Sequence, residues 1–367
     1  MKKRINVVSH GRFHMLDLAR ELEINGFDVK FYSFVPPSFC EKYHLPRKCY
    51  VPIIYLIAPI LIVARRFPIF DKVRNIVQDI VTCLIMRKCD VLICMTGFKY
   101  VAMLARKRGA VVIFERGSKH IIEQQRILSS IPNNLNQNIP SFNIRRNLWA
   151  YSFADYISIA SLHVARSFYI HNYPKEKLFI NPYGVDLSMF HPDFNAKKEY
   201  DVIMVGGWSY RKGCDLIVEA LRESGLKFLH VGGIVDLEFP NLPNFTHVDA
   251  VDQSKLVGYY NKAKIALLPS REEGLAMVQA QAIACNLPLV GSVDSGAEDL
   301  RAMVEYPEYI TIVNEYTPAC VKTSIDKGLD MYNSLGNKVY AGKAIENLTW
   351  SAYGKRYADF IKRIVYK

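Results

Sequence analysis

Two basic residues, Arg211 and Lys212, stand between an apolar run and an amphipathic stretch. The run Asp201–Val205 predicts a buried strand, Gly206 and Gly207 predict a turn, and Asp215–Leu221 predicts a helix. Cations held between a strand end and the next helix can neutralise a diphosphate, through charge-assisted hydrogen bonds worth about 1.5–3 kcal/mol each. Basic loops are more often solvated, so a diphosphate site would require further binding groups from another segment of the chain.

A second segment, from Pro269 to Leu300, supplies candidates for those groups. A strand over Ile265–Leu268 and a helix over Ala276–Cys285 enclose a short acidic loop, and the helix is expected to begin near Gly274. The amide groups of Gly274, Leu275 and Ala276 would then be unsatisfied donors at a helix N-terminus, where a diphosphate binds well.

Glu273 precedes those amides, and Gln281 follows it by eight residues on a similar side of the helix. The Glu273 carboxylate would repel phosphate, yet it can accept hydrogen bonds from sugar hydroxyls. An acidic residue at a helix start can also serve the helix dipole alone, so the segment by itself leaves both interpretations open.

Other motifs are missing from the chain. No GxxxxGK[ST] sequence occurs, which argues against a P-loop NTPase. The eight cysteines form no CxxC pair and no His-Cys cluster, so we expect neither a disulfide framework nor a zinc site, and a reducing cytosol is the expected compartment. The basic start followed by Ile5–Val8 predicts a buried first strand, not a secretory signal.

Short β-branched runs alternate with helical stretches throughout the 367 residues, which predicts an α/β fold with two doubly wound, Rossmann-like domains facing a central cleft. We place the first domain at residues 1–190 and the second at 191–350, with a final helix over about 351–367 packing back on the first. The expected strands are Ile5–Val8, Asp28–Phe34, Val91–Cys94, Val111–Glu115 and Tyr156–Ile159, then Asp201–Val205, Phe228–Val231, Ile265–Leu268 and Pro288–Gly291.

The positive charge is confined to one part of the chain. Residues 1–150 carry 24 Lys and Arg against 10 Asp and Glu, a net charge of +14, whereas the remainder has a net charge of −2. An excess of this kind favours an anionic partner, although it can also serve solubility alone. No nucleic-acid-binding motif accompanies it, so an anionic membrane surface is the preferred partner.

Three segments depart from the alternation. The apolar stretch Tyr50–Ala64 is too short to span a bilayer, and an apolar stripe from Val73 to Ile85 follows it at helical spacing. Both are interpreted as core elements of the first domain or, alternatively, as a membrane contact. The Asn-rich stretch Ser129–Asn147 predicts a polar loop over the cleft or a surface linker.

Taken in order, these segments resemble the retaining glycosyltransferases of family 4, which have the GT-B fold. The resemblance extends over nearly the whole chain, through a glycine turn at Gly11, ERGSKH, ADYISIAS, PYGVD, the RKG loop, LLPSREEG and a tryptophan before the final helix. It implies that Lys212, with Arg211, holds a donor diphosphate and that Glu273 binds the donor sugar. It also implies that His120 lies near the sugar; otherwise His120 is an ordinary histidine at the cleft edge or on the surface.

The resemblance further implies donor binding by a set of residues on both domains, namely Gly11, Gly206, Gly207, Gly274, Leu275, Ala276, Met277 and Gln281. Two residues depart from the family pattern. Gln281 replaces the second glutamate, which usually accepts hydrogen bonds from the nucleotide ribose. Gly207 stands where an arginine is common, so Arg211 is the expected substitute.

The function expected from this resemblance is transfer of a sugar from a UDP- or GDP-linked donor to a glycan. We expect a lipid-linked acceptor, as in bacterial surface polysaccharide synthesis, a location in the cytoplasm on the inner face of the membrane, and no metal or other cofactor. Two alternatives stay open: a nucleotide-sugar epimerase or hydrolase on the same fold, and a non-catalytic scaffold that binds sugar nucleotides.

Overall fold

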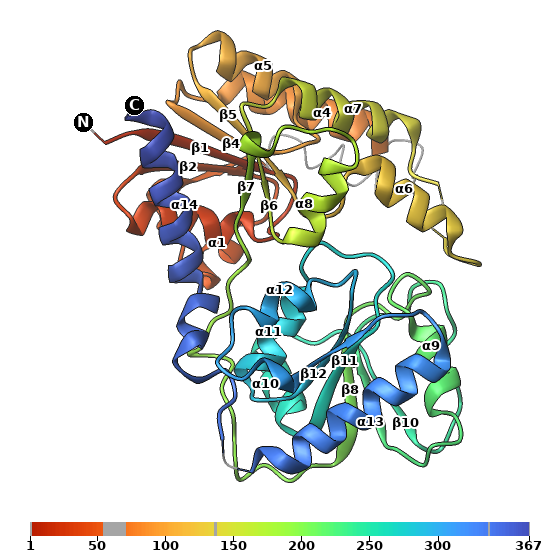
Figure 1. Ribbon diagram of the computed structural model, residues 1–367. Helices are drawn as coiled ribbons and strands as arrows, with labels where there is room; N and C mark the ends of the chain where they lie inside the picture. The colour runs from red at the N-terminus through yellow and green to blue at the C-terminus, as the bar shows by residue number, and fades with distance from the viewer. Residues whose placement is uncertain (1, 54–70, 136–137, 337, 367) are drawn as a thin grey trace.

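The computed structural model describes residues 2–53, 71–135, 138–336 and 338–366. The chain forms two layered α/β units, each built on one parallel sheet, and the first unit lies above the second in Figure 1. The carboxyl ends of both sets of strands are therefore the natural places to look for a shared site.

The first sheet has the strand order β3-β2-β1-β4-β5-β6-β7. All its pairs are parallel, with Val7 opposite Phe31 in one neighbour and Ile93 in the other. The inner strands are buried on both faces, which is why they are continuous apolar runs in the sequence. The strands are β1 Arg4–Ser9, β2 Asp28–Ser33, β3 Tyr50–Pro52, β4 Val91–Met95, β5 Val111–Arg116, β6 Tyr156–Ile159 and β7 Leu178–Ile180.

Helices cover both faces of this sheet. One face packs against α1 and α14, and the other packs against α5, α7 and α8. The helices of this unit are α1 Met15–Ile24, α2 Pro37–Lys42, α4 Asp71–Ile85, α5 Lys99–Lys107, α6 Ile121–Ser130, α7 Ser141–Phe153, α8 Leu162–Tyr169 and, from the far end of the chain, α14 Trp350–Val365. Short 3-10 helices occur at Arg47–Cys49 and Lys175–Lys177.

The second sheet has the order β10-β9-β8-β11-β12-β13 and is also parallel. Helices α9 and α13 cover one face, and α10, α11 and α12 cover the other. Its elements are β8 Tyr200–Val205, α9 Cys214–Leu221, β9 Phe228–Val231, β10 Phe245–Val248, α10 Gln253–Asn261, β11 Ala263–Leu268, α11 Met277–Ala284, β12 Leu289–Ser292, α12 Ala297–Arg301, β13 Ile310–Val313 and α13 Pro318–Leu335, with 3-10 helices at Pro307–Tyr309 and Gly342–Leu348.

The chain crosses between the two units twice, after β7 and before α14. The crossing segments lie side by side, because Val185 forms a parallel bridge with Thr349 and donates its amide to Leu348 O at 2.7 Å. Helix α14 then packs on α1, where Gly354 lies against Glu21, and Tyr357 donates to Glu115 Oε1 at 2.7 Å. The final helix thus belongs structurally to the first unit.

The expectations for the three unusual segments have mixed outcomes. Most of Tyr50–Ala64 lies outside the described residues. The expectation that the stripe of α4 is core is wrong for Val73, Ile80 and Leu84, which are 47%, 45% and 80% exposed. Helix α4 instead buries Gln78, Asp79 and Thr82, because Asp79 accepts the first three amides of α5 at 2.8–2.9 Å.

The loop expected over 129–147 is shorter than the sequence indicated. Its second half is the start of α7, so the description as loop is wrong there. Its first half does reach the second unit, where the amide of Leu135 donates to Asp236 at 3.3 Å. Within the described part of the chain, none of the helices combines the length and the apolar character that crossing a bilayer requires.

Candidate functional site

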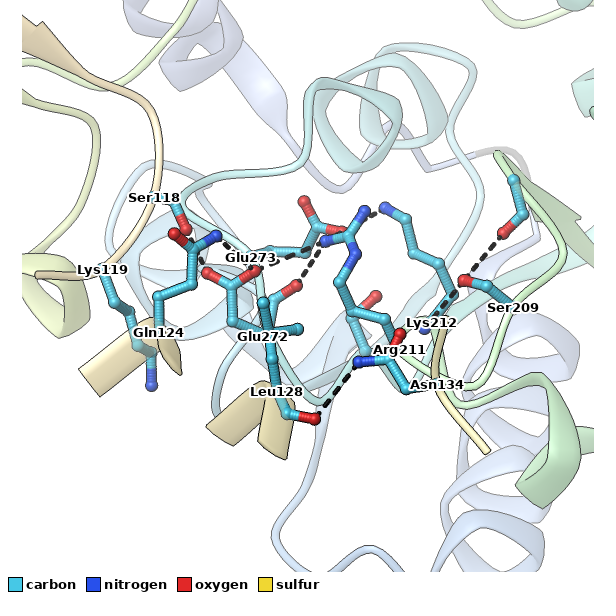
Figure 2. A network of polar contacts seen from close by, with 12 residues as sticks. Ser118, Lys119, Gln124, Leu128, Asn134, Ser209, Arg211, Lys212, Glu272 and Glu273 are labelled. Atoms are coloured by element: carbon cyan, nitrogen blue, oxygen red, sulfur yellow. Dashed lines mark hydrogen bonds and ion pairs between the residues drawn. The ribbon is translucent and has the colours of Figure 1, made fainter. Parts of the chain in front are cut away.

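Arg211, Lys212 and Glu273 come together at the carboxyl edge of the second sheet. Strand β8 leads into the first two and β11 into the third, and these strands are neighbours, with Ile203 opposite Ala266. Strand order reverses at this pair, and in open parallel sheets ligands commonly bind beside the carboxyl ends of the strands at such a point. Glu273 Oε1 accepts from Arg211 Nη1 at 2.8 Å and is ion-paired with Lys212 Nζ (Figure 2).

A glycine allows the basic loop to lie against β11. Gly213 has φ +74° and precedes α9, and a Cβ there would lie 2.3 Å from Pro269 O. Arg271 fixes the same loop, because its guanidinium binds Asp215 through two bonds of 2.6 and 2.7 Å and its amide donates to Arg211 O at 2.9 Å. These contacts therefore fix the position of the backbone that carries both cations.

The three charged groups stabilise one another's ionised forms. Burial alone would raise the pKa of Glu273, but Lys212 and Arg211 outweigh it and hold that pKa below its ordinary value. Burial would likewise lower the pKa of Arg211, and Glu273 with Glu272 outweighs it, so the pKa is raised. Two cations and a carboxylate thus form a partly buried cluster, where electrostatic interactions are stronger than in water.

The first unit contacts this cluster through residues that the sequence analysis did not single out. Glu272 is 1% exposed; its Oε1 accepts from Ser118 and its Oε2 from Gln124 Nε2 at 3.3 Å (Figure 2). Lys119 forms an ion pair with Asp294, which also accepts from Tyr316 OH at 2.6 Å. The only signal for them in the sequence was the ERGSKH stretch, which supplies Ser118 and Lys119 but points to neither partner.

The helix N-terminus expected at Gly274 begins slightly later. Helix α11 starts at Met277, and the amide of Ala276 donates to Ser295 O at 3.4 Å, so Ala276 is not a free donor. The described residues provide no acceptor for the amides of Gly274, Leu275 and Met277, which remain the candidate anion-binding groups. Gly274 is packed tightly, because a Cβ there would lie 2.1 Å from Gly117 O.

Other expected donor-binding residues line the same edge. The side chain of Lys212 runs past Gly206, where a Cβ would lie 3.8 Å from Lys212 Cε, and Gly207 follows directly. Gln281 is 7% exposed, and its Oε1 accepts from Tyr260 OH at 3.1 Å, so the amide has a fixed orientation. Gly11 lies on the first unit, after β1, and touches none of these groups.

His120 is not part of this cluster. It is 5% exposed, caps α6 through Nδ1, and stacks on His171 at 4.1 Å beside Phe168 and Tyr151. Burial, together with His171 and Arg116, lowers its pKa to about 4. The aromatic side chains of α7 and α8 hold the ring inside the first unit, and the placement of His120 near a donor sugar stays a prediction.

Within the described ranges, no group of three or more His, Cys, Asp or Glu side chains is placed to hold a metal ion. The chemistry that the cluster can perform is instead that of a diphosphate site. Two fixed cations lie beside a carboxylate that can accept from hydroxyl groups, and the loop that follows this carboxylate has amides without an acceptor among the described residues.

Comparison with known proteins places this geometry in context. Residues 199–316 match the family model described as Glycosyl transferases group 1. A probable sucrose-phosphate synthase of Thermosipho melanesiensis is 22% identical over 245 residues, which are 58% of this chain and 56% of that protein. The D-inositol 3-phosphate glycosyltransferase 2 of Catenulispora acidiphila is 30% identical over 121 residues, 32% of this chain and 27% of the relative. The chain thus spans about half, or less, of the length of these curated relatives.

Solved structures match over the whole chain. The Anabaena protein HepE in complex with UDP and glucose aligns with a TM-score of 0.68 at 12% identity, covering 98% of this chain and 100% of that one. The sucrose-phosphate synthase from Thermosynechococcus elongatus aligns with a TM-score of 0.62 at 14% identity, covering 99% of both. The chain has the GT-B fold. Its Arg211, Lys212, Glu273 and Gln281 all lie within the matched group 1 segment.

Proposed function

We propose that this chain is a glycosyltransferase that uses a nucleotide-sugar donor. The observation that carries the proposal is the convergence of Arg211 and Lys212 on Glu273, at the point where the strand order of the second sheet reverses. The match of residues 199–316 to Glycosyl transferases group 1 supports it. The glycosyltransferase and synthase names of the curated relatives support it as well.

The arrangement suggests how the bond from the sugar to the diphosphate would break. Negative charge grows on the leaving phosphate oxygen, and Arg211 and Lys212 stabilise that charge more than they stabilise the bound donor. In the structure Glu273 neutralises both cations. A bound diphosphate would take over that role, and Glu273 would then be released to accept hydrogen bonds from the sugar hydroxyls.

The finer features of the reaction also belong to the proposal. We place the chain among the retaining enzymes of family 4, with a UDP- or GDP-linked donor and no metal. The bound UDP and glucose in the HepE structure support a uridine donor by analogy only. Gln281 would meet the ribose hydroxyls with an amide in place of the family's carboxylate, held in orientation by Tyr260.

The acceptor is proposed to be a lipid-linked glycan at an anionic membrane surface. The net charge of +14 on residues 1–150 supports this, as do the exposed Ile80 and Leu84 on α4. Sedimentation with anionic and neutral vesicles tests the membrane contact. Binding to anionic vesicles only, weakened by salt and by Leu84→Asp but not by Ile24→Asp on the exposed end of α1, is expected; equal binding of both vesicle types would refute it.

The donor is tested by thermal-shift titration with UDP-, GDP- and ADP-sugars. One nucleotide should raise Tm with saturation, and Lys212→Ala should lose the response. Lys322→Ala, on the exposed surface of α13, is the matched control and should keep it. A response to none of the nucleotides would contradict the proposal.

Product analysis then separates the open alternatives. Transfer to an acceptor identifies a transferase, and conversion of donor without acceptor identifies an epimerase or hydrolase. Binding without any turnover identifies a scaffold.

A further inference from the structure

A cavity of about 730 Å³ lies between the two units, away from Arg211 and Lys212. Helix α8 and the end of β7 form its upper wall, and α12 and the end of β13 form its lower wall. A cavity of this volume is large enough for an organic molecule of some twenty to thirty non-hydrogen atoms. Neither the proposed donor nor the proposed chemistry uses it.

Most of the lining is apolar. Leu162 and Ile180 line the cavity from the first unit, and Val293, Met303 and Ile312 line it from the second. Leu162 and Val293 are 53% and 36% exposed, although both are large hydrophobic side chains. Small-molecule sites commonly have such walls, with a few polar groups that fix the ligand's orientation.

Three donors of the lining, on an exposed Arg166 and on Arg301 and His163, have no hydrogen-bond partner within the described part of the chain. Arg166 has no polar partner among the described residues, and Arg301 Nε is buried with no acceptor. His163 Nδ1 is also buried without a hydrogen bond, on a side chain that is only 9% exposed. Buried donors without partners cost free energy, so each calls for an explanation.

The two carboxylates of the cavity are already engaged. Asp299 Oδ1 accepts the amide of Leu162 at 2.5 Å, at the start of α8, and Glu298 lies 3.4 Å from Arg301 Nη1. Asp299 Oδ2 is 3.7 Å from His163 Nδ1, beyond hydrogen-bonding distance. Among the described residues Arg166 is thus the cation of the lining that has no carboxylate partner, and its guanidinium is available to an anionic group of a ligand.

We propose that this cavity is a second ligand site, for an amphipathic organic anion. A phosphate or carboxylate would face Arg166 and Arg301, and an apolar body would cover Leu162, Met303 and Ile312. Guanidinium groups match such anions because they donate parallel hydrogen bonds.

The cavity is connected to the Arg211, Lys212 and Glu273 cluster by direct contacts. Ser161 Oγ donates to Gly274 O at 2.7 Å, and Gly274 packs on Gly117. His163, which lines the cavity, bonds Glu273 O through Nε2 at 2.8 Å. A ligand that moves His163 therefore moves the backbone of Glu273. This coupling, unlike the binding itself, rests on the proposed function.

Binding is tested by calorimetry with decyl phosphate below its micelle concentration, with decanol and inorganic phosphate as the two halves of the probe. One decyl phosphate per chain should bind, at least tenfold tighter than either half. The double variant Arg166→Gln/Arg301→Gln should weaken it at least tenfold, and Ala302→Trp, which fills the cavity, should abolish it.

Arg222→Gln, an exposed arginine on the far side of the second unit, is the matched control and should leave the binding unchanged. Equal binding of decanol and decyl phosphate, or indifference to Ala302→Trp, would overturn the proposal, since the space would then be an interdomain crevice only.

The coupling is tested by titrating UDP with and without saturating decyl phosphate. The dissociation constant of UDP should change at least threefold, and linkage requires the reciprocal change for decyl phosphate. His163→Phe should remove the change while both ligands still bind. An unchanged UDP affinity in the wild type would overturn the coupling. Absence of UDP binding altogether would count against the proposed function and leave the cavity assignment standing.

Discussion

The carboxyl edges of the two sheets have the same topology and different chemistry. In the second sheet the reversal point between β8 and β11 holds Arg211, Lys212 and Glu273, all charged and mutually paired. In the first sheet the corresponding point, between β1 and β4, holds His10, which stacks on Phe98 at 4.2 Å and bonds Gln78 at 2.7 Å. Burial lowers the pKa of His10 to about 4, so its ring is neutral.

The difference shows that the sheet topology determines where a site can form, whereas the residues of the loops determine which groups it can bind. A parallel sheet creates a crevice wherever strand order reverses, whatever residues stand there. The second edge is suited to a diphosphate. At the first edge the residue that follows β1 is a stacked, neutral imidazole, so this edge lacks the paired charges found at the second.

The largest effect expected from this contrast is on nucleotide affinity. Arg211→Ala should weaken UDP binding by about 1.5–3 kcal/mol, the value of a charge-assisted hydrogen bond. His10→Ala, at the matching point of the first sheet, should leave UDP affinity unchanged, because His10 touches none of the cations. Isothermal titration of both variants measures this, and equal losses would erase the distinction between the two edges.

The next effect concerns the backbone that fixes the basic loop. Gly213→Ala would combine a positive φ with a Cβ only 2.3 Å from Pro269 O, whereas Gly225→Ala has a similar φ of +69° and open space. The αL strain alone costs about 1–2 kcal/mol, and the clash should add about 1–3 kcal/mol at Gly213. Urea unfolding measures the free energy of unfolding of both variants, and the difference between them gives the cost of the clash. Equal losses of stability would mean that the loop is not held against β11.

A further effect is expected on the pH dependence of stability. Burial lowers the pKa of His120 in the first unit to about 4, and it does the same for His230 in the second. Because the unfolded chain takes up these protons first, stability should fall between about pH 6.5 and 4, by up to about 1.4 kcal/mol per pH unit for each histidine.

The controls for this prediction are single substitutions followed by urea unfolding across that pH range. His120→Phe should flatten the dependence by about one proton. His191→Phe, at an exposed position, should leave it unchanged. An unaltered slope in His120→Phe would show that the ring is protonated without opening the aromatic cluster.

The smallest effect should come from restoring the family's carboxylate. Gln281→Glu would keep the bond from Tyr260 OH and present a stronger acceptor to the ribose hydroxyls. UDP affinity should rise by about 1 kcal/mol, the difference between a charged and a neutral hydrogen bond. A weaker affinity would instead show that the amide at Gln281 is adapted to a donor of another kind.

The sequence was a good guide to the second unit. Strands such as β9 fell on the predicted residues, and the Arg211, Lys212 and Glu273 group could be anticipated because neighbouring loops at one sheet edge must meet. The alternation of strand-like and helical segments also predicted the first sheet, where β6 has the same bounds as the predicted strand.

Contacts between the units could not be anticipated in this way. Glu272 meeting Ser118 and His163 meeting Glu273 depend on how two separate sheets face each other, which no local pattern encodes. The buried side of helix α4 could not be predicted either. Its sequence has an amphipathic period, but Asp79 is buried and caps α5, so polar residues of α4 face inward. No local pattern indicated that aromatic side chains of α7 and α8 pack around His120.

The return of α14 to the first unit has a consequence for synthesis. Strand β1 and helix α1 leave the ribosome first, yet the surface that Tyr357 and Ile361 bury stays uncovered until more than three hundred further residues have been made. At about 5–20 residues per second, that interval lasts from some twenty seconds to over a minute. A nascent chain of this kind is expected to bind chaperones. A truncation before α14 would leave this apolar surface of the first unit permanently exposed.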